Sequence, residues 1–93
     1  MSSRKFARVW DALEPEAEIA AQMKARSTLM TALRDRIVRA RWTQAEAAKR
    51  LGVTQPRIST LMRGKLSLFS IDTLVAVATA ASLKVEIKVR RVA

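Results

Sequence analysis

The stretch "TQAEAAKRLGVTQPRISTLMRGK", residues 43–65, holds two short helical patterns that meet at Gly52. Thr43 with Glu46 three residues later forms a capping box, so a helix is predicted to begin there. Gly52 can take the left-handed conformation that often ends a helix, and Thr54 can cap a second one. Two short helices joined by a tight turn with glycine indicate a helix-turn-helix.

The buried side of this predicted pair is small or apolar. Ala48 is placed where the two helices cross, because only a small side chain lets them approach closely. Ile58 is expected to face the core, flanked by Leu51, Val53 and Leu61. The second helix would then be held rigidly, with its other side free.

That free side is polar. An arginine can pair with guanine through two hydrogen bonds, a glutamine with adenine, and serine or threonine with either. A helix presented in this way can enter the major groove, and Arg57 is the preferred base contact. Gln44, Lys65 and Arg41 are expected to contact phosphates. The predicted DNA-binding set is Arg41, Gln44, Thr54, Gln55, Arg57, Ser59, Thr60, Arg63 and Lys65. Taken singly, each could equally be a solvent-exposed polar side chain.

Positive charge is concentrated in the middle of the chain. The net charge is +10, and residues 23–65 hold eleven basic and two acidic side chains, a net of +9. A localised basic field indicates a polyanionic partner, and double-stranded DNA leads, although a basic face can also serve only solubility. RNA is less favoured, because aromatic residues are 4% of the chain and offer few surfaces for base stacking.

The composition excludes several other classes of function. The 93 residues suffice for one domain and contain neither cysteine nor histidine. Disulfides, thiolate zinc sites and the commonest general base are therefore absent, and the carboxylates are scattered. We therefore expect that the protein is not an enzyme and that it binds neither a metal ion nor a cofactor. No apolar run approaches the ~18 residues of a membrane span, so we expect a cytoplasmic, nucleoid-associated protein without membrane contact.

The fold class predicted is mainly α, with about five helices and a C-terminal β-strand. Residues 1–22 are assigned to an N-terminal arm or short helix, whose Phe6 and Trp10 either dock a partner or pack on the domain's own core. Residues 23–82 form the helix-turn-helix domain, whose first helical segment is either one long helix or two. Residues 83–93 alternate apolar and charged side chains, which predicts a strand. Because no other stretch resembles a strand, pairing between two copies in a homodimer is preferred.

Residues 43–65 resemble the helix-turn-helix core of the XRE family, the phage-repressor-type DNA-binding domains. The extension "LFSIDTLVAVATAASLKVEIKV" resembles small XRE proteins that end in a strand, many of them HigA-type antitoxins. The resemblance implies that Gln44 contacts phosphate, that Gln55, Arg57 and Thr60 face bases, and that the protein binds a palindromic operator as a homodimer. The chain departs from the family at Pro56 and Met62, where many relatives have polar residues.

Two functions stay open at this point. One is a DNA-binding transcriptional repressor. The other is an antitoxin, which would neutralise a RelE/HigB-like ribonuclease toxin and repress its own operon. The acidic residues Asp11, Glu14, Glu16 and Glu18 are the local feature that suits a basic protein partner.

Overall fold

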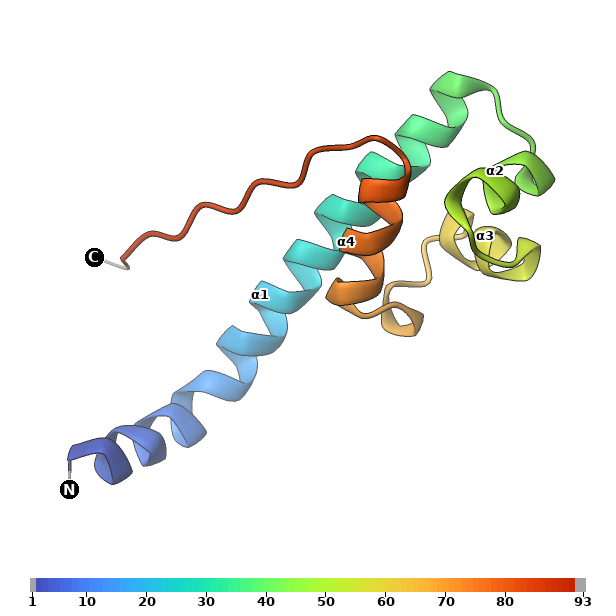
Figure 1. The fold of residues 1–93 in the computed structure, drawn as a ribbon. Coiled ribbons are helices and arrows are strands. Elements are labelled where there is room, and N and C mark those ends of the chain that lie inside the picture. The colour runs from blue at the N-terminus through green and yellow to red at the C-terminus, as the bar shows by residue number, and fades with distance from the viewer. Residues whose placement is uncertain (1, 92–93) are drawn as a thin grey trace.

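The computed structural model describes residues 2–91, with side chains described from residue 16 onward. Four α-helices and one short 3-10 helix follow one another along the described chain (Figure 1). Their bounds are α1 Ser2–Ala40, α2 Gln44–Leu51, α3 Gln55–Met62, η1 Leu66–Leu68 and α4 Ile71–Ala80. Within the described residues, no helix is long and apolar enough to cross a membrane.

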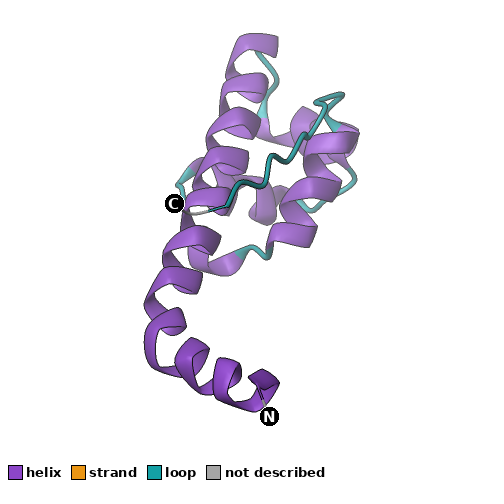
Figure 2. Ribbon diagram, turned by 90° about the vertical axis from the view of Figure 1, so that its left-hand side faces the viewer, coloured by secondary structure: helices purple, strands orange, loops and turns teal. Residues whose placement is uncertain are grey.

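Helix α1 resolves the choice between one long helix and two. It runs without a break for 39 residues, and the sequence between Pro15 and Ala40 contains no glycine or proline that would end it. Thr28 Oγ1 donates to the Lys24 carbonyl oxygen of the preceding turn, at 3.0 Å. The helix bends in the N-terminal part that contains Pro15 (Figure 2). The side chains of Phe6 and Trp10 lie outside the described ones, so both alternatives for the N-terminal arm stay predictions.

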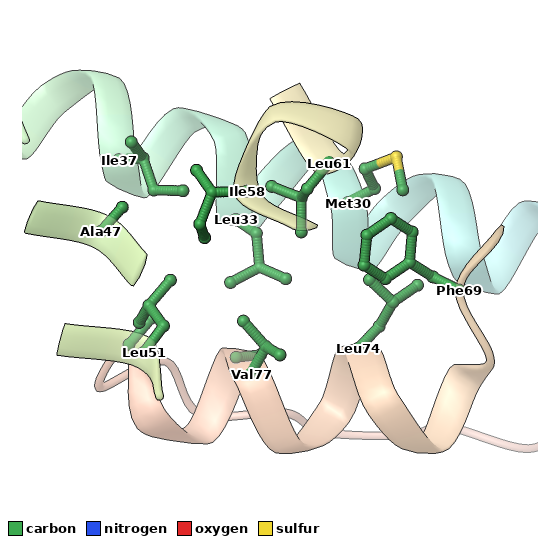
Figure 3. Packing of buried hydrophobic residues seen from close by; sticks show 12 residues of the cluster. Met30, Leu33, Ile37, Ala47, Leu51, Ile58, Leu61, Phe69, Leu74 and Val77 are labelled. Atoms are coloured by element: carbon green, nitrogen blue, oxygen red, sulfur yellow. The ribbon is translucent and has the colours of Figure 1, made fainter. Parts of the chain in front are cut away.

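The core is formed where α1 meets the three other α-helices (Figure 3). Each helix contributes its apolar side, and no polar or charged residue among those described is buried. Leu33, Ile58 and Leu74 are fully enclosed at the centre. The buried residues are Met30, Leu33, Ile37, Ala47, Leu51, Ile58, Leu61, Phe69, Leu74, Val77, Ala78 and Ala81. The two helices of the motif are therefore packed against α1 and α4.

The predicted C-terminal strand is wrong. Residues 83–91 run as an extended segment beside α1 and α4, and the described chain contains no β-strand (Figure 2). The alternating pattern does place Leu83 and Val85 against the core, while Ile87 and Val89 are 78% and 89% exposed. A strand also needs ladder hydrogen bonds to a second extended segment, and the described residues provide none.

The predicted count of five helices is also wrong, since the described chain has four α-helices. The last of them, α4, begins after Ser70, whose hydroxyl accepts from the Thr73 N–H at 3.1 Å and so caps the helix. The segment between α3 and α4 contains only η1, a 3-10 helix of three residues.

Candidate nucleic-acid interface

The local signals of the motif act as the sequence predicts. Thr43 Oγ1 accepts from the Glu46 N–H at 3.1 Å, and Thr54 Oγ1 accepts from the Arg57 N–H at 3.3 Å. The Glu46 carboxylate lies 3.5 Å from the Thr43 hydroxyl. Gly52 has a φ of 70°, and its N–H donates to the Ala48 carbonyl oxygen. Both helices of the pair are therefore capped.

The buried side of the helix pair is small or apolar, as predicted. Ile58 and Leu61 are buried, and of the predicted flanking residues Leu51 is buried and Val53 is half-buried against the core. Ala47 is fully buried and Ala48 is half-buried against the same core. The placement of Ala48 at the crossing of the two helices stays a prediction.

The polar side of α3 is accessible along its length. Gln55, Arg57 and Arg63 are exposed, whereas Ser59 and Thr60 are half-buried. The Thr60 hydroxyl donates to the Pro56 carbonyl oxygen at 3.0 Å, which occupies its proton but leaves acceptor capacity on the oxygen. The structure thus brings these residues together on one helix: Ser59, Thr60 and Arg63 lie away from the buried Ile58 and Leu61, and Arg57 lies at the edge of the buried side.

Arg57 makes a contact that the sequence did not indicate. Its guanidinium carbon lies 5.2 Å from the centroid of the Phe69 ring, a cation–π geometry. Phe69 is 3% exposed and precedes α4, so the arginine covers a core aromatic from outside. This contact between segments twelve residues apart restricts the arginine side chain on the surface of α3.

The remaining predicted residues lie around the motif. Gln44 begins α2 and is exposed, and Lys65 is exposed directly after the Gly64 turn. Arg41 is exposed at the end of α1 with a φ of 57°, in the left-handed region that glycine favours. Thr54 is exposed and serves as the α3 cap. Among the side chains of residues 16–91, no group of three or more acidic residues gathers to hold a metal ion.

Trp42 joins the motif to the long helix. The guanidinium carbons of Arg36 and Arg50 lie 4.7 Å and 5.1 Å from its ring centroid. Arg36 Nε also donates to the Ala81 carbonyl oxygen at 3.0 Å, which connects α1 to the end of α4. Sequence reasoning missed this arrangement, because its three parts come from separate segments. It fixes the direction in which α2 leaves α1.

Comparison with known proteins agrees with this geometry. Residues 12–90 match a family described as a helix-turn-helix domain. A solved structure whose name places it provisionally in the XRE family of transcriptional regulators is 40% identical, with a TM-score of 0.72 over 83% of each chain. The chain belongs to the XRE family of helix-turn-helix proteins. The comparison with curated proteins gives no match.

Proposed function

We propose that this XRE-family protein is a sequence-specific DNA-binding transcriptional repressor that inserts residues 55–63 into a major groove. The observation that carries this is the doubly capped helix pair, which buries Ile58 and Leu61 of α3 and leaves Gln55, Arg57 and Arg63 exposed. These side chains have the donors and acceptors that base edges require. The solved relative is named as a transcriptional regulator, which supports the proposal.

The phosphate contacts are proposed for Arg41, Gln44 and Lys65. Arg41 and Lys65 are exposed and positively charged beside the helix pair, so each can pair with a phosphate. Gln44 lies in the first turn of α2, where unpaired N–H groups favour an anion.

Arg57→Ala is the test of base recognition. We expect a loss of about 1–3 kcal/mol in operator binding, confined to one base-pair position, because an arginine that reads guanine forms two hydrogen bonds with it. Binding to a panel of operator variants, each with one base pair changed, measures this. Arg39→Ala is the control, since that exposed arginine on α1 pairs with Asp35 and removes the same charge. An unchanged base preference in Arg57→Ala would sink the assignment.

We propose that the protein acts as a homodimer through residues 83–91. Ile87 and Val89 are the most exposed large apolar side chains described, and they alternate with the charged Lys88 and Arg90 along the extended segment. A largely apolar groove of about 520 Å³ lies between this segment, α1 and α4. A second copy that covered these groups would remove apolar surface from water.

The double variant Ile87→Ser, Val89→Ser is expected to weaken the dimer at least tenfold, because burying each such side chain contributes roughly 1.5–3 kcal/mol. Sedimentation equilibrium across a concentration series measures the dissociation constant. Lys88→Ala, between the two positions, is the matched control. A double variant that dimerises like the wild type would place the interface elsewhere.

The HigA-type antitoxin is the second candidate. Residues 16–20 of α1 are all exposed and include Glu16, Glu18 and Ile19, so this part of the helix offers acidic and apolar groups to a basic partner. In that function, α3 binds DNA and represses the operon, while the N-terminal part of α1 binds the ribonuclease toxin. A neighbouring gene for a small basic ribonuclease is the feature that separates the two candidates.

A further inference from the structure

The turn that ends the recognition helix has an arginine from a different helix beside it. Arg34 belongs to α1, thirty residues earlier in the chain, yet its Nη1 lies 3.5 Å from the point where a Cβ of Gly64 would stand. Gly64 has a φ of 75°, which favours glycine, so no side chain covers the guanidinium from this residue. Leu61 of α3 and Leu33 of α1 share the core that holds the two elements together (Figure 3).

The charge of Arg34 is not neutralised within the described side chains. The ion pairs found among residues 16–91 join Arg39 with Asp35, at 2.8 Å, and Lys84 with Glu86, at 3.3 Å. Asp35, the nearest acidic residue in sequence, is therefore engaged by Arg39. Arg34 is exposed, and its side chain forms none of the hydrogen bonds found in that part of the chain. Its guanidinium keeps its N–H donors available to a ligand.

We propose that Arg34 binds a DNA backbone phosphate beside the C-terminal end of α3, together with Lys65. The proposal rests on the proposed function, which places α3 in a major groove. A guanidinium offers two parallel donors that match a phosphate, and Lys65, directly after Gly64, adds a second charge. A recognition helix lies in the major groove, and the phosphates line the edges of that groove. We therefore expect groups just beyond the end of α3 to reach the DNA backbone.

This contact gives α1 a role in positioning. A phosphate bound between α1 and the turn after α3 would be held by two elements of the core, so it fixes the orientation of the recognition helix on the duplex. It carries no base preference of its own. The sequence alone did not single out Arg34, because nothing local distinguishes it from the other arginines of α1.

The experiment compares Arg34→Gln with Arg39→Gln, two exposed arginines of α1 that each lose one charge. Binding to a duplex from the protein's own upstream region, and to a scrambled duplex, is measured at several salt concentrations. For Arg34→Gln we expect affinity about five- to tenfold lower on both duplexes, and a log–log salt slope smaller by about one per protomer. Arg39→Gln keeps the wild-type slope, and Arg34→Lys keeps the slope because it keeps the charge.

Two results would overturn the role of Arg34 and leave the proposed function standing. In the first, Arg34→Gln and Arg39→Gln have the same log–log salt slope, while the wild type still binds its upstream duplex selectively. The other is an altered base preference, which would make Arg34 a base contact. A wild type that binds neither duplex would overturn the proposed function itself. Thermal unfolding of each variant confirms that the proteins compared are folded.

Discussion

Leu33→Ala is expected to cost about 2–5 kcal/mol of unfolding free energy, the range for truncating a fully enclosed leucine. Leu33 is 0% exposed and lies among residues from α2, α3 and α4 at the centre of the core (Figure 3). A chain of 93 residues has a total stability of roughly 5–14 kcal/mol, so this one change removes a large share of it.

Urea unfolding followed by circular dichroism measures the loss, and Leu68→Ala is the matched control. Leu68 is 62% exposed in η1, so the same truncation there is expected to change the stability by less than about 0.5 kcal/mol. Equal losses for the two variants would contradict the core described here. Operator binding by Leu33→Ala should fall in proportion to the unfolded fraction, because Leu33 is fully enclosed and cannot contact DNA itself.

The parts of the fold that sequence predicted are those set by local interactions. The caps Thr43 and Thr54 satisfy N–H groups within three residues, and Gly52 meets a backbone demand of its own turn. Such signals depend only on a few neighbouring residues, so they can be recognised in the sequence alone. The burial of Ile58 and Leu61 follows from helical periodicity in the same way.

What the sequence could not predict depends on contacts between distant segments. The alternation after Ser82 predicts an extended backbone, but a strand also needs a partner, which pattern alone does not supply. The stacking of Arg57 on Phe69 and the position of Arg34 beside Gly64 arise only once the helices are packed. The sequence therefore predicted which residues belong to the candidate site, but the contacts between them came from the structure.

Raising the salt concentration from 50 to 200 mM is expected to lower operator affinity by about a thousandfold. Binding releases counterions from each phosphate that a lysine or arginine neutralises, so affinity falls with a slope of about −0.9 per contact. Arg34, Arg41 and Lys65 in each protomer of a dimer would make about six such contacts. The concentration of basic side chains between residues 23 and 65 is consistent with that number.

Specific and non-specific binding respond differently to the same titration. On a scrambled duplex of equal length, only phosphate contacts remain, so affinity should be lower at every salt concentration by roughly 10³-fold or more. On the upstream duplex, base contacts from α3 persist when the phosphate contribution is screened. A selectivity that stays nearly constant while both affinities fall would establish that the basic surface and the recognition helix act separately. Equal weak binding to both duplexes would instead reduce the basic surface to non-specific attraction and leave α3 without a sequence to recognise.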